Sequence, residues 1–467
     1  MKKQFLFGMA AVAALCSCSN NEVMEAPESL QTPITFGTYV GNSVNGRAAV
    51  TDIDALKNGT NANENGSVTN ITSGFGVFAY YTAQKTWNDV AASATPNFMY
   101  NQKVQWDGTT NATAPTTTPA WKYSPLKYWP NNDGDKISFY AYAPFTAVTN
   151  VATGTTGNID QNITEFTENS AEGAPTVTYF VKPEAIKAQQ DLVYAESSAS
   201  GDNPNQDLSK QTNVDNAAIT TKQKVTFNFV HALARIGFNV ETLIDEENSA
   251  GTGTTENNTT TGKDYEVDGS SNPLTIVKVT EVQLKGKFYQ SGVLDLVNGT
   301  WGSTTTPVSE STFTLSYQTE DNTADVSDIL DSNFDNNVAE KVTTGKQQLN
   351  AKDSYIMVIP QQFATENGLT IVVKYDVYTK DSNLKANGST VVEEDVDGSG
   401  TAAIWSKISN EITSSPFAID LAKGKAYMFN LHLGLTSVKF DASVTGWGTN
   451  NEKVVNVPLN TATGAGA

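Results

Sequence analysis

The stretch Val225-Thr226-Phe227-Asn228-Phe229 decides the fold class, because its apolar residues occupy every second position. Side chains along a β-strand point alternately to opposite faces of a sheet, so this pattern predicts a strand with one buried face and one solvated face. The same period of two recurs along the whole chain, over residues 34–40, 137–142, 427–435, 438–444 and 455–459. We find no comparable helical stripe. The chain is therefore expected to be all-β and built from antiparallel strands.

Length and charge narrow the classes of protein further. The chain has 467 residues, and its 50 Asp and Glu against 30 Lys and Arg give a formal net charge of −20. This charge argues against a nucleic-acid binder, because phosphate neutralisation needs clustered basic residues. It also disfavours electrostatic docking on anionic lipid. At roughly 150 residues per domain, two or three domains are expected, each with its own core.

Long tracts rich in Thr, Asn, Gly and Ser separate the predicted strands and are interpreted as loops. The tract near residues 197–220 gives the best domain boundary. We expect an N-terminal β-sandwich domain over residues 48–205 and a C-terminal β-sandwich domain over residues 220–467.

The N-terminus has the pattern of an export signal. Lys2 and Lys3 precede an apolar run from Phe5 to Leu15. This run is too short to span a bilayer, which needs about 20 residues, and no later stretch is long enough, so no transmembrane helix is expected. Residues 1–17 are predicted to be a lipoprotein signal peptide. Residues 18–47 are predicted to form a lipidated tether and a first strand.

The lipid acceptor is predicted from Leu15-Cys16-Ser17-Cys18, which resembles the bacterial lipobox. A Leu three positions before Cys18 and a small residue just before it make Cys18 the expected acceptor, which would anchor the chain through acyl groups. Cys16 as acceptor and an ordinary signal peptide remain alternatives. With Cys16 removed and Cys18 acylated, no thiol is left for a disulfide, a zinc site or a nucleophile.

Residues that could carry chemistry are scarce. The two histidines are expected to be a hydrogen-bonded residue at the edge of the core, His231, and a surface residue, His432. The acidic turn from Glu393 begins like a calcium loop, but Ile404 stands where a bidentate Glu is needed. Neither a phosphate-binding loop nor a nucleophile elbow occurs. We expect no enzymatic activity, no cofactor and no metal; a hydrolase with two converging carboxylates is the weakest alternative.

Aromatic residues gather between residues 121 and 130. Trp121 and Trp129 would suit a platform that stacks on glycan rings. The other interpretation is structural, because aromatics beside a hairpin usually pack against the end of a sandwich.

Several motifs follow one another in order from residue 1 to about 447. They are Leu15-Cys16-Ser17-Cys18, Pro33-Ile34-Thr35-Phe36, Gly46-Arg47-Ala48, Gly74-Phe75-Gly76-Val77-Phe78-Ala79-Tyr80, Tyr128-Trp129-Pro130, the strand 137–144, Asp191-Leu192-Val193-Tyr194-Ala195, the segment 225–236, Val358-Ile359-Pro360-Gln361-Gln362 and Gly424-Lys425-Ala426-Tyr427. Together they resemble the fimbrillin family, the type V pilus subunits and related surface lipoproteins of Gram-negative bacteria.

This resemblance implies two tandem transthyretin-like β-sandwich domains and assembly by strand exchange. It implies a lipoprotein of the cell outer membrane that joins a fimbrium after processing and supports adhesion. The implied partners are a trypsin-like protease, other fimbrial subunits and a surface ligand of the host or of another bacterium. The protease would cut after Arg47, the only basic residue between Lys3 and Lys57, and leave Ala48 as the new N-terminus. Residues 18–47 would then act as a propeptide. Whether the protein is a stalk, tip or anchor subunit is left open.

The cut would release the strand that bears Ile34, Phe36 and Val40 and leave an open groove. The donor candidate is the terminal segment with Val455, Val457 and Leu459, whose Pro458 is tolerated best at a sheet edge. The alternatives are that Arg47 is a solvated loop residue and that the terminal segment is an ordinary last strand. A non-polymerising surface lipoprotein that binds glycans is the alternative function.

Overall fold

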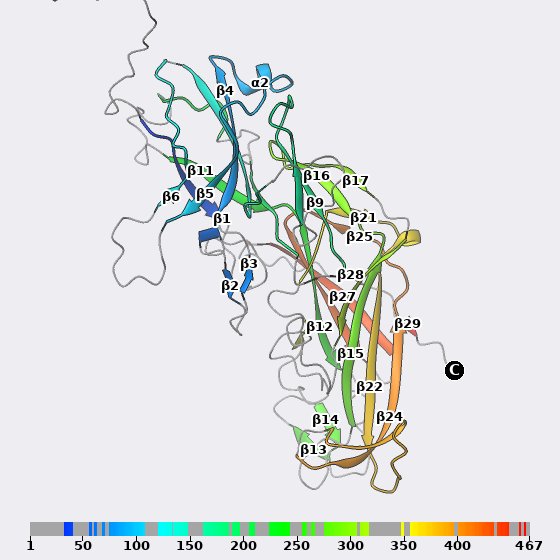
Figure 1. Cartoon of the computed structure of the whole chain (residues 1–467). Coiled ribbons are helices and arrows are strands. Elements are labelled where there is room, and N and C mark those ends of the chain that lie inside the picture. The colour runs from blue at the N-terminus through cyan, green and yellow to red at the C-terminus, as the bar shows by residue number, and fades with distance from the viewer. Residues whose placement is uncertain are drawn as a thin grey trace, which may run out of the picture.

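The computed structural model describes a subset of the chain. The described residues are 32–40, 56–57, 60–62, 68–70, 74–107, 120–132, 134–147, 162–184, 186, 189–196, 205–210, 224–242, 255–258, 263–266, 275–305, 309–316, 347–349, 355–396, 400–433, 437–447, 457–458 and 462–463. Within them the chain is nearly all β-strand (Figure 1), which confirms the expected fold class. The transthyretin-like topology stays a prediction.

Two sheets form the N-terminal end of the molecule. Sheet 1 has the order β1 (Thr35–Val40), β11 (Lys224–His231), β10 (Val193–Ala195), β7 (Lys136–Ala143), β4 (Phe75–Ala83), β5 (Met99–Trp106) and β6 (Trp121–Lys122). Sheet 2 has the order β17 (Trp301–Thr305), β16 (Ser291–Asp295), β9 (Thr176–Phe180) and β8 (Ile163–Phe166). Buried aromatic rings of β4 and β7 share one hydrophobic cluster with residues of β9 and β16, so the two sheets pack face to face.

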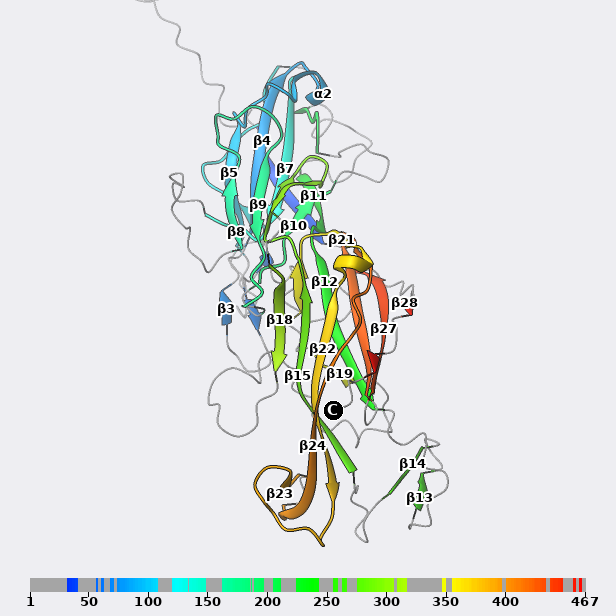
Figure 2. The ribbon, with the colours of Figure 1, turned by 90° about the vertical axis from the view of Figure 1, so that its right-hand side faces the viewer.

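Two further sheets form the C-terminal end. Sheet 3 has the order β19 (Gln347–Gln348), β12 (Ala234–Thr242), β26 (Lys425–Leu433), β27 (Ser437–Gly446) and β28 (Val457–Pro458), with β20 (Ile356–Val358) beside β12 and β29 (Ala462–Thr463) beside β27. Sheet 4 has the order β18 (Ser311–Ser316), β15 (Thr275–Gly286), β22 (Thr370–Lys380), β24 (Ala403–Thr413) and β23 (Val391–Glu394). Their inner faces also share the large cluster, and Figure 2 shows the two pairs of sheets arranged end to end.

The remaining described elements are short. They are the pairs β2 (Thr60–Ala62) with β3 (Val68–Asn70), β13 (Thr255–Asn258) with β14 (Lys263–Glu266) and β21 (Gln361–Phe363) with β25 (Ile419–Leu421), the helix α2 (Trp87–Val90) and the 3-10 turn η4 (Thr365–Asn367). Most pairings between strands are antiparallel, as the alternation predicts. The pairs β1 with β11 and β12 with β26 are parallel, and each joins strands far apart in the sequence, as a crossover connection requires.

The two ends of the molecule share strands and contacts. β11 completes sheet 1, and after Ala232 and Leu233 the chain enters sheet 3 as β12. The hairpin β16–β17, which lies between β15 and β18 in the sequence, pairs with β9 in sheet 2. The chain therefore passes between the two ends at residues 232–233 and again before and after residues 291–305. The expected domain boundaries stay a prediction.

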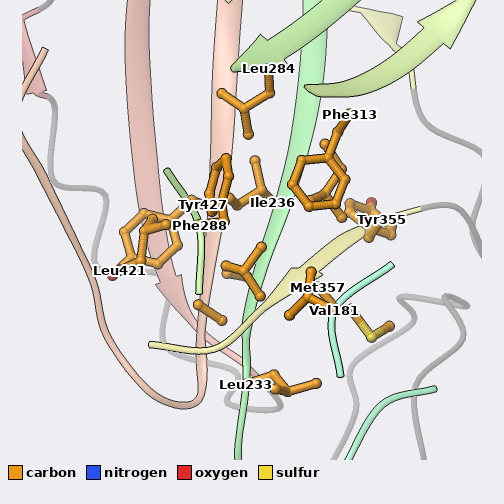
Figure 3. Close-up of a cluster of buried hydrophobic side chains, with 14 of the residues drawn as sticks. Val181, Leu233, Ile236, Leu284, Phe288, Phe313, Tyr355, Met357, Leu421 and Tyr427 are labelled. Carbon is orange, nitrogen blue, oxygen red and sulfur yellow. The ribbon is translucent and has the colours of Figure 1, made fainter. Parts of the chain in front are cut away.

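Side chains at this junction hold the two ends together. Figure 3 shows Val181, which follows β9, beside Met357 of β20. The side-chain oxygen of Gln189 accepts the backbone N–H of Met357 at 2.8 Å. Lys423 donates to the hydroxyl of Tyr194 at 2.6 Å and to the carbonyl of Gly299 at 2.8 Å, and burial lowers its pKa. One continuous core thus runs through both ends.

Candidate functional site: the groove of the first strand

The first strand is buried on one face and exposed on the other. Ile34 is 0% exposed and Phe36 is 2% exposed, whereas Tyr39 on the opposite face is 53% exposed. Their alternation with Thr35 and Gly37 produces this division, since neighbouring side chains of a strand point to opposite faces. Ile34 and Phe36 therefore lie where the sequence predicts; the backbone of Val40 ends β1, and its side chain lies outside the described residues.

β1 lies between two borders. On one side it pairs in parallel with β11, with Thr35 opposite Lys224 and Val40 opposite Phe229. On the other side its start meets the segment 127–129, where the N–H of Ile34 donates to the carbonyl of Lys127 at 2.9 Å. β1 is the last strand of sheet 1. An edge strand that adds to a sheet in this way gains affinity from main-chain hydrogen bonds.

Tyr123 gives the groove a side-chain contact with the backbone of the first strand. Its hydroxyl donates to the carbonyl of Ile34 at 2.9 Å and accepts the N–H of Lys127 at 3.2 Å. Burial is the main cause that raises the pKa of Tyr123 to about 12. The hydroxyl is therefore a neutral donor at physiological pH.

Four aromatic rings enclose the side chain of Phe36. Ring centroids lie 5.2 Å away for Tyr123, 5.6 Å for Phe227, 6.0 Å for Phe139 and 6.3 Å for Phe75. These distances suit edge-to-face and offset pairs. The groove is thus a hydrophobic pocket with a backbone ladder beside it, an arrangement that binds an extended strand.

The predicted glycan residues lie in the wall and floor of this groove. Trp129 is 2% exposed and packs against Phe139, with ring centroids 6.0 Å apart. Trp121 is 9% exposed and packs against Phe75 and Trp106, at 5.0 Å and 5.3 Å. These contacts cover the ring faces that a sugar would need. This placement matches the structural interpretation of the aromatic cluster, and glycan binding stays an untested prediction.

The predicted donor segment is partly described. Val457 pairs with Ala442 and Pro458 with Asp441 on the outer edge of β27, and β29 pairs with the start of the same strand. Each of these contacts with β27 covers two of the described residues. Val455 and Leu459 lie outside the described residues, as do Cys18, Arg47 and Ala48.

Sequence reasoning missed the role of Tyr123, which it grouped with the other aromatics of residues 121–130. Its place beside the short strand β6 gave no signal that its hydroxyl reaches the backbone of the first strand. The expectation that His231 is hydrogen-bonded at the edge of the core is confirmed, because its Nδ1 lies 2.8 Å from Oδ2 of buried Asp191.

Within the described residues, no group of three or more His, Cys, Asp or Glu side chains could hold a metal ion. No helix in the same part of the chain has the length and apolarity needed to cross a membrane. What the geometry does provide is binding of an extended strand at a sheet edge. The class of protein that these features define is an all-β protein of sandwiched sheets whose first strand fills an edge groove.

Comparison with known proteins narrows this class. No family model matches the chain. The chain is 27% identical to the fimbrium subunit Fim1C of Phocaeicola vulgatus over 475 aligned residues, which cover 98% of this chain and 100% of that protein. The crystal structure of a fimbrial protein from Bacteroides vulgatus matches with a TM-score of 0.53 and 23% identity, over 89% of this chain and 99% of that one, and so shares the fold. The resemblance to the fimbrillin family is confirmed.

Proposed function

We propose that the chain is a structural fimbrial subunit, in the stalk or at the tip, that supports adhesion and assembles by exchange of β-strands. The observation that carries this proposal is the buried edge strand β1, with Ile34 and Phe36 in a groove formed by β11 and the segment 127–129. Removal of the strand would expose apolar surface and one edge of β11, which favours the addition of a replacement strand.

The proposed route begins with export as a lipoprotein through Cys18 to the outer membrane. A trypsin-like protease then cuts between Arg47 and Ala48 and releases the first strand. The C-terminal segment of another subunit fills the groove. A head-to-tail contact of this kind does not close on itself, so it produces a filament.

The terminal segment suits the role of donor in two respects. Its apolar residues Val455, Val457 and Leu459 have the spacing of Ile34 and Phe36. Its described residues pair with β27 at the outer edge of sheet 3, where a strand can leave without breaking a ladder between two inner strands.

Charge does not drive this association. Residues 1–47 contain three basic and three acidic residues, so the net charge of −20 belongs to the chain from Ala48 onward. Subunits of like charge repel each other, and the attraction must come from apolar strand insertion.

Limited trypsin digestion of the precursor tests the proposal. We expect one early cut after Arg47, found by N-terminal sequencing, followed by a ladder of oligomers in native gels. Arg47→Gln should remain uncut and monomeric, whereas the matched variant Lys57→Gln, at the next basic position, should behave like the wild type. Quantitative cleavage that leaves a stable monomer would contradict the proposal.

The donor assignment has its own test. Val457→Asp should be cut like the wild type and should fail to form the ladder, because a charge cannot enter an apolar pocket. Asn456→Asp adds the same charge at the neighbouring position, which the alternation of an inserted strand would turn away from the pocket, and should still polymerise. Equal ladders from both variants would exclude this segment as the donor.

A further inference from the structure

The strand that borders the groove ends in a buried polar contact. β11 ends at His231, whose side chain is 5% exposed and hydrogen-bonded to the fully buried Asp191 at 2.8 Å. His231 continues the row of alternate residues that begins with Val225 and includes Phe227. The hydrogen bond fixes the plane of its imidazole ring at the junction of the two ends of the molecule.

The indole ring of Trp447 stacks on this imidazole ring. The ring centroids lie 4.0 Å apart and the planes differ by 4°. The backbone attaches Trp447 as well: its N–H donates to the carbonyl of Gly424 at 2.8 Å, and the N–H of Gly424 donates to the carbonyl of Leu233 at 2.9 Å. Trp447 is therefore connected to the end of β11 by its ring and, through Gly424, to the start of β12.

A partly buried cation lies beside the same stack. The guanidinium of Arg235 is 5.3 Å from the ring centre of Trp447 and 4.4 Å from that of Tyr355. Burial lowers the pKa of Arg235, while Tyr355 and Asp191 act in the opposite direction. Within the described residues the indole N–H of Trp447 has no acceptor, so stacking and the cation hold this side chain in place.

Trp447 lies in the chain between β27 and the C-terminal segment. Trp447 directly follows β27, and the C-terminal segment after it returns along the outer edge of β27 as β28 and β29. On the other side of the stack, β11 is the strand against which β1 lies. The stack thus joins the root of the C-terminal segment to the strand that borders the groove.

We propose that Trp447 is a positioning residue: its stack on His231 couples the occupancy of the groove beside β11 to the attachment of the C-terminal segment to β27. While β1 fills the groove, β11 is held, the stack is intact and the C-terminal segment stays on its own β27. Loss of β1 loosens the end of β11 and, through the stack, the root of the C-terminal segment. The inference gains its biological role from the proposed strand exchange, but the coupling itself is a property of the monomer.

Hydrogen–deuterium exchange of the full-length precursor tests this coupling without filament formation. Trp447→Ala should speed exchange in peptides covering 437–446 and 457–463 on the order of tenfold, because an aromatic contact and its burial are lost. Trp447→Phe keeps a ring and should restore most of the protection. Trp405→Ala removes a fully buried indole at the distal end of sheet 4, which packs in a separate cluster with Ile276 and Tyr378, and should affect only β15, β22, β23 and β24.

A double-mutant cycle then measures the coupling. Phe36→Ala, which loosens β1, should raise exchange in residues 457–463 of the wild-type background and should add little in the Trp447→Ala background. Additive effects of the two substitutions, or unchanged exchange at 457–463 in Trp447→Ala, would overturn the proposal. A polymerisation failure would leave these monomer results intact, so the two hypotheses can fail separately.

Discussion

Replacing Phe36 by alanine should release the first strand without unfolding the rest of the molecule. The Phe36 side chain is 2% exposed and meets four aromatic rings. Truncation of a buried Phe to Ala costs about 3–5 kcal/mol. Each 1.4 kcal/mol is a factor of ten in an equilibrium constant, so the population with β1 detached should rise on the order of 100-fold to 1,000-fold or more.

The loss in the global free energy of unfolding should be smaller than the loss of about 3–5 kcal/mol expected for the docking of the strand. β1 is an edge strand, so once it detaches, further weakening of its docking no longer affects the remaining core. Hydrogen exchange of the amides of residues 34–40 reports the local opening, and urea unfolding reports the global free energy. The rate of tryptic cleavage after Arg47 should rise with the local opening if access to the site is limited by strand docking.

Tyr39→Ala is the matched control, because Tyr39 belongs to the same strand and is 53% exposed on its opposite face. A surface substitution of this kind usually changes stability by less than about 0.5 kcal/mol. The reasoning would be refuted by equal exchange in the two variants. It would also be refuted by a loss of protection in Phe36→Ala that is uniform over all four sheets.

Three further predictions concern the groove and the junction. Tyr123→Phe removes one hydrogen bond to the first strand and should weaken the docking of that strand by about 0.5–1.5 kcal/mol, as measured by hydrogen exchange of β1. Tyr128 lies nearby and is 38% exposed, so the control Tyr128→Phe should leave the exchange of β1 unchanged. Folding raises the pKa of Tyr123 from 10.0 to about 12, so the folded state binds more protons than the unfolded state between pH 10 and pH 12. The contribution of Tyr123 to stability should therefore be complete below pH 10 and decline towards pH 12. The hydrogen exchange of β1 should depend less on pH over this range in Tyr123→Phe than in the wild type. Gly299→Ala should lose more stability in urea unfolding than Gly134→Ala. Both glycines have positive φ (67° and 82°), which costs about 1–2 kcal/mol for alanine. Of the two, only Gly299 would place the new Cβ on a neighbouring atom, the hydroxyl oxygen of Tyr194. Equal losses in the two glycine variants would contradict this account of the junction.

Local pattern predicted the strands well and their partners poorly. The alternation over 225–229 and 137–142 gave β11 and β7, because burial of one sheet face leaves a period of two in the sequence. The burial of Ile34 and Phe36 followed from the same rule. The pairing of β16 with β9, and of β1 with β11, depends on contacts between residues far apart in the sequence, which no local pattern encodes.

The candidate site was predicted in part for the same reason. The residues that fill the groove are apolar and alternate, so the sequence revealed them. The wall is different: Trp121 and Trp129 are compatible with a solvent-exposed platform and with a core, and only tertiary packing distinguishes the two. Trp447 carried no signal at all, since its contact with His231 joins residues from opposite sides of the junction.

The pairing of the hairpin β16–β17 with β9 limits the order in which the chain can fold. A chain that emerges N-terminus first presents β8 and β9 long before residues 291–305 arrive to complete their sheet. Sheet 1 is likewise incomplete until residues 224–231 add β11 between β1 and β10. The first half of a growing chain therefore has its aromatic face uncovered until the second half is available, and it is exposed to aggregation during that interval.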